Sequence, residues 1–259
     1  MSMIEAFFLG VIQGLTEFIP ISSTGHLYLG RHAFGLDEAG LFLDTMLHLG
    51  TLLAVFVVFQ KELFYIIRHP FSKLSGLVII GTFPAVIVGI LFEDFFDKIS
   101  QTGSTIGWEF LVTGLFLYFA DGVRAGHKSL DDIQFRDALF IGTFQAAAIF
   151  PALSRSGLTI AAGLFRKLDR GTAAYFSFLL STPAILGGVL FQSKEMFNGH
   201  YETIGLQALL IATISSALFG YIAIVFMINL LKKSSLKIFS YYVWILGGFI
   251  LIAQWTGVF

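Results

Sequence analysis

Cysteine is absent from the 259-residue sequence, which excludes disulfide bonds and thiolate chemistry. Charge is also scarce, because 13% of the residues are charged, against about 25% in an average soluble domain. The net charge is −1 and no run of basic residues occurs, so we expect no nucleic-acid partner. The N-terminus carries Glu5 and no basic cluster before its apolar stretch, so we expect no cleaved signal peptide.

Apolar residues, by contrast, are abundant. They make up 56% of the chain, and phenylalanine alone occurs 30 times. A soluble fold of this length has too little interior to bury so much apolar surface, so the chain must face membrane lipid. The composition therefore predicts an all-α integral membrane protein, with residues 1–259 forming a single membrane domain.

The apolar stretches are of two kinds. Those that approach the ~20 residues needed to cross a bilayer predict six transmembrane helices, at 41–60, 74–92, 106–120, 172–192, 204–231 and 238–257. Two more, at 3–29 and 138–165, are interrupted by "FIPISSTG" and "FPALSRSG". Broken backbone is tolerated at membrane depth only when it is buried in protein or lines a wet cavity. We therefore predict that both stretches are re-entrant helical hairpins.

The basic residues give this layout an orientation. Twelve of the sixteen lie in four segments that fall on one side, which the positive-inside rule makes cytoplasmic: Lys61, Arg68 and Lys73; Arg124, Lys128 and Arg136; Arg166, Lys167 and Arg170; Lys232, Lys233 and Lys237. The other side keeps Arg31, Lys98 and Lys194, with the acidic Glu93, Asp94 and Asp97. Both termini are then predicted to lie outside.

The two interrupted stretches align without a gap. "QGLTEFIPISSTGHL" from Gln13 and "QAAAIFPALSRSGLT" from Gln145 share the pattern Q-x4-F-x3-S-x-[ST]-G. One hairpin enters from outside and the other from inside, so the chain is expected to form an inverted-topology repeat of roughly 1–120 and 121–259. Such repeats bring two broken helices together around one site near the midplane. We therefore expect the two motifs to face each other.

Arg155 is the charge that the second hairpin carries at membrane depth. An arginine there needs an anionic partner. The simplest interpretation is an ion pair with Glu17 that holds the hairpins together. A sharper interpretation adds Ser154, Ser156 and Thr159, because a guanidinium fork with hydroxyls and free amides at a helix start binds phosphate oxygens.

The first hairpin supplies the complementary groups. Ser22, Ser23 and Thr24 are candidate nucleophiles or phosphate ligands, and one of them is expected to cap the helix that begins near Gly25. Glu17 and His26 are the local bases that could activate a serine. His26 can equally be a polar contact at the interface.

Three further polar features have weaker patterns. Gln13 and Glu17 share a helical face and could hold a divalent cation. Asp44 and His48 form a second i,i+4 pair, for which a structural role is favoured over a catalytic one. Glu109 lies near a span end and is expected to reach water.

Both motifs resemble those of one family, the undecaprenyl-diphosphate phosphatases of the bacitracin-resistance (BacA/UppP) type. "QGLTEFIPISSTGH" matches its [EQ]-x3-E motif followed by S-S-T-G-H, and "PALSRSGLT" matches P-G-x-S-R-S-x-x-T. The resemblance covers essentially the whole chain. It implies a multi-pass enzyme of the bacterial inner membrane that converts undecaprenyl diphosphate into the monophosphate carrier for peptidoglycan. It also implies a site facing the outer side and support from Mg²⁺ or Ca²⁺.

The resemblance also assigns roles to residues of this chain. Glu17, Ser23, His26 and Arg155 fall on catalytic positions, with Ser23 on the proposed nucleophile. The substrate-binding set comprises Ser22, Thr24, Ser154, Arg155, Ser156 and Thr159, and the metal ligands are Gln13 and Glu17. In this hypothesis Ser23 attacks the terminal phosphoryl group while His26 or Glu17 takes its proton, or water attacks directly. Two positions depart from the family pattern: Gln13 is often Glu, and Ala152 replaces the glycine before Ser154.

Other functions remain alternatives. A lipid-carrier transporter or flippase would use the same inverted-repeat site. A phosphatase of the PAP2 type is rejected, because no His follows Arg155 at the spacing that its motif requires. A membrane scaffold would not explain Arg155. The "LGG" stretches at 186–188 and 246–248 would permit a homodimer.

Overall fold

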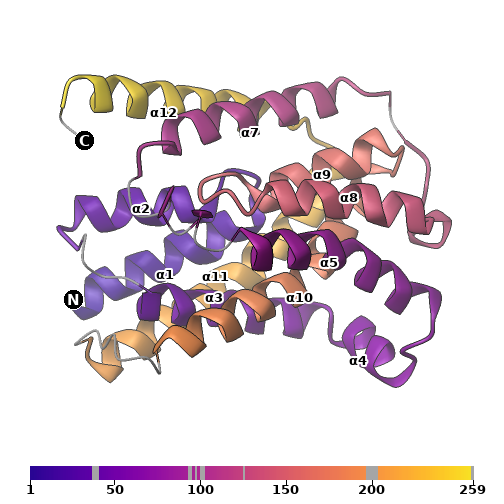
Figure 1. The fold of residues 1–259 in the computed structure, drawn as a ribbon, viewed down its shortest axis with the longest axis horizontal. Coiled ribbons are helices and arrows are strands. Elements are labelled where there is room, and N and C mark those ends of the chain that lie inside the picture. Colours follow the sequence, from indigo (N-terminus) through magenta and orange to yellow (C-terminus); the bar gives the residue numbers. More distant parts are fainter. Residues whose placement is uncertain are drawn as a thin grey trace.

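The fold is known from a computed structural model that describes residues 1–36, 41–92, 95–96, 98–99, 103–124, 126–196 and 204–257 (Figure 1). The acidic residues Glu93, Asp94 and Asp97 and the side chain of Lys194 lie outside the described part. Within it the regular structure is helical, and the one β contact is an isolated bridge between Lys128 and Leu168. The predicted all-α class is confirmed.

Two series of helices follow one another along the chain. The first series is α1 (Met3–Phe18), α2 (Ser23–Ala33), α3 (Leu41–Val58), α4 (Gln60–Arg68), α5 (Lys73–Leu91) and α7 (Ile106–Asp121). The short 3-10 helix η1 (Leu130–Asp132) precedes the second series. That series is α8 (Phe135–Ala147), α9 (Arg155–Phe165), α10 (Arg170–Met196), α11 (Leu206–Leu231) and α12 (Lys237–Trp255).

Several of these helices are long and apolar enough to cross a bilayer. Among the described residues they are α5, α10 over Arg170–Leu190, α11 and α12, and the bent pair α3–α4 makes a fifth at most. The protein is therefore a multi-pass membrane protein. The predicted span 41–60 is wrong in its end, because the chain bends by 83° between α3 and α4 at Phe59. Helix α7 has 16 residues, fewer than the ~20 that a straight crossing needs.

Both predicted helix breaks are confirmed. Helix α1 ends at Phe18, two residues before Pro20, and α8 ends at Ala147, before Pro151. Proline has no amide hydrogen and disfavours the helical conformation in the residue before it, so neither helix can continue through its proline. The second helix of the first hairpin begins at Ser23, two residues earlier than expected.

The two hairpins pack in related ways. Helix α1 lies against α11, and α8 lies against α5. Gly10 and Gly142, which are equivalent in the gap-free alignment, lie at these two interfaces. A Cβ atom on Gly10 would collide with the carbonyl oxygen of Ala212, and one on Gly142 with the backbone of Gly81. Glycine at both positions therefore permits close approach of the helix backbones.

The four basic segments meet at one end of the molecule. Arg170 Nη1 donates to Asp121 at 2.7 Å, and the Leu236 amide donates to the same carboxylate at 2.8 Å. Lys73 Nζ donates to the carbonyl oxygen of Asp131. Both chain termini lie at the opposite end, at the left of Figure 1, whereas α4 lies at the right.

Candidate active site

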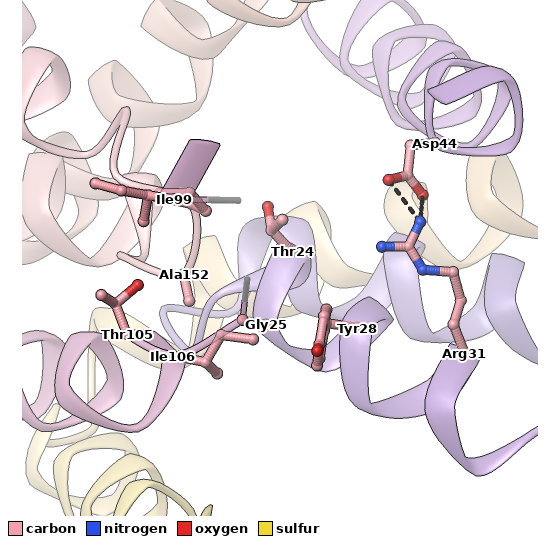
Figure 2. A pocket seen from close by; sticks show the side chains of 11 residues that line it. Thr24, Gly25, Tyr28, Arg31, Asp44, Ile99, Thr105, Ile106 and Ala152 are labelled. Atoms are coloured by element: carbon pink, nitrogen blue, oxygen red, sulfur yellow. Dashed lines mark hydrogen bonds and ion pairs between the residues drawn. The ribbon is translucent and has the colours of Figure 1, made fainter. Parts of the chain in front are cut away.

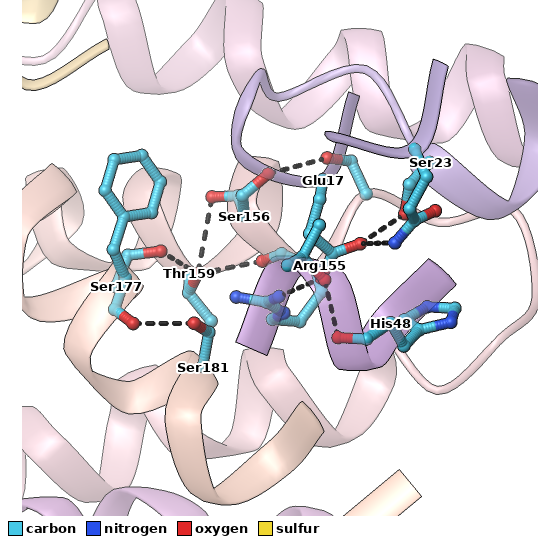
Figure 3. A network of polar contacts seen from close by, with 12 residues as sticks. Glu17, Ser23, His48, Arg155, Ser156, Thr159, Ser177 and Ser181 are labelled. Atoms are coloured by element: carbon cyan, nitrogen blue, oxygen red, sulfur yellow. Dashed lines mark hydrogen bonds and ion pairs between the residues drawn. The ribbon is translucent and has the colours of Figure 1, made fainter. Parts of the chain in front are cut away.

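Glu17, in the last turn of α1, lies where the two hairpins meet. Its side chain is 7% exposed. Ser23 Oγ donates to Glu17 Oε2 at 2.6 Å, and Gln13 Nε2 donates to the same oxygen at 3.1 Å. Arg155 Nη2 donates to Glu17 Oε1 from the second hairpin (Figure 3). The two motifs therefore face each other, as the alignment predicts.

Arg155 is the first residue of α9, and only one of the two terminal nitrogens of its guanidinium has a hydrogen-bond partner. Nη2 forms the ion pair with Glu17, but Nη1 is buried and makes no hydrogen bond with any described residue. A buried donor without a partner costs about 1–3 kcal/mol. The predicted ion pair between the hairpins is therefore present, and it leaves Arg155 Nη1 available to bind an anion.

The three hydroxyls of the first hairpin have different surroundings. Ser22 is the N-cap of α2 and accepts the Gly25 amide at 3.3 Å, with a φ of 74° that non-glycine residues rarely adopt. Ser23 faces Glu17. Thr24 lines an adjacent cavity. One hydroxyl therefore caps the helix, as expected, and another donates to the Glu17 carboxylate.

His26 points away from Ser23. Its Nδ1 lies 2.7 Å from the carbonyl oxygen of Ser22, and its Nε2 lies 2.8 Å from the Tyr242 hydroxyl of α12. The ring stacks on Tyr242 with centroids 5.7 Å apart and meets Phe110 edge-on. Of the two bases proposed for the serine, only Glu17 contacts Ser23.

The hydroxyls of the second hairpin lie inside the protein. Ser154 is the N-cap of α9 and accepts the Gly157 amide at 3.0 Å. Ser156 Oγ lies 3.4 Å from the carbonyl oxygen of Ile19 in the first hairpin. Thr159 Oγ1 donates to the Arg155 carbonyl oxygen at 2.8 Å. These contacts fix the backbone that carries Arg155.

The prediction that Glu109 reaches water is wrong. Its side chain on α7 is buried, and the Ala152 amide donates to its Oε2. One turn later, Thr113 Oγ1 accepts the Ser154 amide at 3.1 Å. Helix α7 therefore anchors the turn that precedes Arg155. The only sequence signal is this i,i+4 polar pair within an apolar segment.

The turn itself suits an alanine at position 152. The described non-glycine residues with positive φ are Ser22 and Lys167, so Ala152 has a backbone conformation that alanine adopts readily. The Glu109 carboxylate satisfies the amide of Ala152, which is 1% exposed.

A small, partly open pocket lies beside the hairpin tips (Figure 2). Thr24 of α2 and Ala152 of the second hairpin both line it. Arg31 and Asp44 line it as well and form an ion pair at 2.9 Å. Both hairpins therefore border the same hollow, next to the hydroxyl run.

A divalent cation would find few ligands on the protein. Within the described ranges, no three His, Asp or Glu side chains are grouped in a way that could hold a metal ion. Gln13 Oε1, however, is buried without a hydrogen-bond partner while Gln13 Nε2 contacts Glu17. One neutral oxygen and one carboxylate fit a Mg²⁺ ion that takes its remaining ligands from water and substrate phosphates.

Known proteins are similar to this chain over its full length. The profile of the family described as "Bacitracin resistance protein BacA" matches residues 6–249. "Undecaprenyl-diphosphatase 3" of Bacillus cereus is 65% identical over 259 residues, covering all of both chains. "Undecaprenyl-diphosphatase" of Carboxydothermus hydrogenoformans is 45% identical over 261 residues, again covering both chains entirely. This chain is therefore a member of the BacA bacitracin-resistance family.

Proposed function

We propose that this protein hydrolyses undecaprenyl diphosphate to undecaprenyl phosphate and inorganic phosphate, and so recycles the lipid carrier for peptidoglycan and other envelope polymers. Relatives that carry the name undecaprenyl-diphosphatase over the full length support the activity. The observation that carries the assignment to residues is the meeting of Ser23, Glu17 and Arg155 across the two hairpins. That meeting joins a nucleophile, a base and an anion-binding group.

The chemistry follows from these contacts as a phosphoryl transfer. Ser23 Oγ forms a bond to the terminal phosphorus while Glu17 Oε2, 2.6 Å away, takes the hydroxyl proton. The bond to the bridging oxygen breaks, and undecaprenyl phosphate leaves with the electron pair. Water then attacks the phosphoserine. The bond between Ser23 Oγ and phosphorus breaks as Glu17 returns its proton to Ser23 Oγ, and dihydrogen phosphate departs with both protons of the water.

Arg155 would stabilise the negative charge of the phosphoryl group during the transfer. The free Nη1 arm would bind the oxygens of the transferred phosphoryl group, while Nη2 keeps Glu17 in place. Positioning and charge neutralisation provide most of the acceleration in phosphoryl transfer. A bound Mg²⁺ or Ca²⁺ on Gln13 and Glu17 would add neutralisation of the phosphate charge.

The re-entrant, inverted-repeat arrangement is part of the proposal. The packing of α1 on α11 and of α8 on α5 supports it, because each hairpin then contacts the corresponding helix of the other repeat. We further propose that the protein lies in the bacterial inner membrane with its site open to the outer side. Gly187, Gly188 and Gly248 face open space, which a second copy in a homodimer would fill.

The test of activity is phosphate release from a long-chain prenyl diphosphate by purified protein in detergent, with and without a chelator. We expect release by the wild type, its loss with the chelator and recovery on adding Mg²⁺ or Ca²⁺. No release under any condition would refute the proposed hydrolysis and favour the lipid-carrier transporter.

The identity of the nucleophile needs a second measurement. Acid quenching of wild-type turnover should trap a phosphoserine at Ser23, and Ser23→Ala should form none and lose nearly all activity. Full activity in Ser23→Ala would establish direct attack by water instead.

Orientation can be tested cleanly because the chain has no native cysteine. We expect a membrane-impermeant maleimide to label Ser2→Cys in intact cells and to label Ser129→Cys only after the membrane is opened. The reverse pattern would invert the proposed topology.

A further inference from the structure

Helix α4 departs from the direction of the long helices. The chain turns by 83° between α3 and α4, and Figure 1 shows α4 at the lower right, at the end of the molecule away from the chain termini. Helix α3 has 18 residues and is therefore roughly 27 Å long, close to the thickness of the hydrocarbon core. A helix that follows it at almost a right angle lies along the membrane surface, not through the bilayer.

Two sides of α4 are apolar, and only one of them packs on the protein. Leu63 and Ile66 belong to the hydrophobic core. Phe64 and Ile67, the next residues around the helix, are exposed, and so is Phe71 just beyond its end. Residues three apart lie on the same side of a helix. Helix α4 therefore presents an apolar face next to the one that it buries.

The basic residues of α4 border this exposed apolar face. Lys61 and Arg68 are exposed and lie seven residues apart, about two helical turns, so their side chains project in the same direction. Arg68 Cζ lies 6.0 Å from the centroid of the Phe64 ring, which places the cation beside the apolar face. Glu62, the acidic residue of α4, is half-buried on another side of the helix. The helix is thus amphipathic on its free surface, with two cations along one edge.

These two cations differ from others at the same end of the molecule. Arg170, Lys128 and Arg166 each form an ion pair with an aspartate, whereas Lys61 and Arg68 form no ion pair with the described residues. A helix that buries its apolar face in the acyl-chain boundary holds its basic residues at the level of the lipid headgroups. Anionic headgroups attract lysine and arginine there. They supply the negative charge that the protein does not.

We propose that α4 is an interfacial helix that binds anionic phospholipid. Phe64, Ile67 and Phe71 enter the acyl-chain boundary, while Lys61 and Arg68 contact the phosphate groups of the lipid. A second copy of the chain fits this surface less well, because a symmetric contact would bring the cations of both copies together. The ligand is a membrane lipid, so this inference does not depend on the proposed hydrolysis.

The lipid around α4 can be measured because the chain has no native cysteine. His69→Cys, at the exposed C-cap of α4, carries an uncharged fluorophore in the purified full chain. The protein is reconstituted in vesicles of equimolar phosphatidylcholine and phosphatidylglycerol, in which one lipid or the other carries a quencher near the top of its acyl chain. Each basic residue near the surface should favour an anionic lipid about fivefold. We therefore expect phosphatidylglycerol to be preferred about 5- to 25-fold beside α4.

Three paired substitutions in this labelled parent test the origin of the preference. Lys61→Gln with Arg68→Gln should bring the two lipids within about twofold of each other, whereas Lys61→Arg with Arg68→Lys keeps both charges and should keep the preference. Arg124→Gln with Lys237→Gln is the matched control. It removes two charges beside α7 and α12, which Figure 1 shows on the opposite edge of the molecule from α4. The control should leave the preference at α4 unchanged.

Several results would overturn the proposal. Equal quenching by the two lipids in the parent would show that α4 has no preference for anionic lipid. The same loss of preference in the control pair would assign it to the overall charge of the protein, and its loss in the pair that keeps both charges would separate it from these cations. Weak quenching by both lipids, with energy transfer between labelled copies, would show that a second copy covers α4 instead.

Discussion

The two hairpins have one architecture and opposite chemistry. In each, a serine caps the second helix and accepts the amide of a glycine three residues later: Ser22 with Gly25, and Ser154 with Gly157. The next residue is Ser23 in one hairpin and Arg155 in the other. The same backbone position thus presents a hydroxyl, the proposed nucleophile, from one side and a cation from the other, and both contact Glu17.

The hairpins also differ in how firmly they are held. In α9 nine of eleven residues are buried, whereas in α2 only Gly25 and Leu27 are. The turn of the second hairpin is anchored to α7 through Glu109, and its cap has an extended backbone. The cap of the first hairpin has a strained backbone at Ser22. The hairpin that carries Arg155 is therefore the more firmly held one, and Ser23, the proposed nucleophile, lies on the hairpin with fewer restraints.

Removing the cation should have the largest effect. We expect Arg155→Ala to lower kcat/KM at least ~1,000-fold, as the loss of a phosphoryl-binding arginine does elsewhere. The protein should still insert into membranes and purify. Phosphate release from a prenyl diphosphate measures the effect. Turnover at the wild-type rate would contradict the proposed binding of phosphate by Arg155.

Stability must be separated from catalysis in that variant. Arg155→Ala leaves Glu17 as a buried unpaired charge, which destabilises a protein by about 3–5 kcal/mol. The double substitution Arg155→Gln with Glu17→Gln removes both charges and should recover much of the thermal stability without recovering activity. Recovery of both would mean that the pair has only a structural role.

Removing the hydrogen bond by which Glu109 anchors the second hairpin should have the next largest effect. Glu109→Leu removes the acceptor of the Ala152 amide, and we expect kcat/KM to fall about 10- to 100-fold through displacement of Arg155, as small misplacements of positioning groups do. Glu109→Gln retains an acceptor and should lose much less. In an Arg155→Ala background, Glu109→Leu should have no further effect on activity. An additive loss there would show that Glu109 acts independently of the arginine.

Sequence reasoning locates most of the helices and both breaks, because apolar runs and the prolines of "FIPISSTG" and "FPALSRSG" are local signals. It also brings Arg155 to Glu17, since the repeat pairs the two motifs. The bend at Phe59 is missed, because no proline or glycine marks it. The burial of Glu109 and the contact of His26 with Tyr242 are missed for another reason. They depend on partners 43 and 216 residues away, which no local pattern encodes.

The end of the second hairpin where α8 begins and α9 ends is held by ion pairs, so its stability should depend on pH. Asp137 in the first turn of α8 accepts Lys128 Nζ at 2.9 Å and Arg166 Nε, at the end of α9, at 2.7 Å. Burial alone would raise the pKa of Asp137, but the hydrogen bonds from Lys128, the Gln134 amide and Arg166 hold this pKa below its ordinary value. Stability from this carboxylate is therefore present above pH ~4 and lost as the pH falls below it.

The measurement is the melting temperature of the purified protein in detergent between pH 7 and pH 3. We expect the wild type to lose stability below pH ~4, and Asp137→Asn to start lower at pH 7 and to fall less. Asp131→Asn, in the same loop, serves as the control and should melt like the wild type at each pH. Parallel curves for the wild type and Asp137→Asn would show that the ionised Asp137 carboxylate does not stabilise the second hairpin.

The smallest effect compares the two caps directly. Ser154→Ala removes an acceptor from an extended cap and should cost about 1 kcal/mol of unfolding free energy. Ser22→Gly also removes a cap, which costs a few tenths of a kcal/mol, but glycine adopts a φ of 74° without strain. Ser22→Gly should therefore melt at or above the wild-type temperature, whereas Ser154→Gly should melt below it. Equal losses at both positions would mean that the first hairpin stores no strain beside its nucleophile.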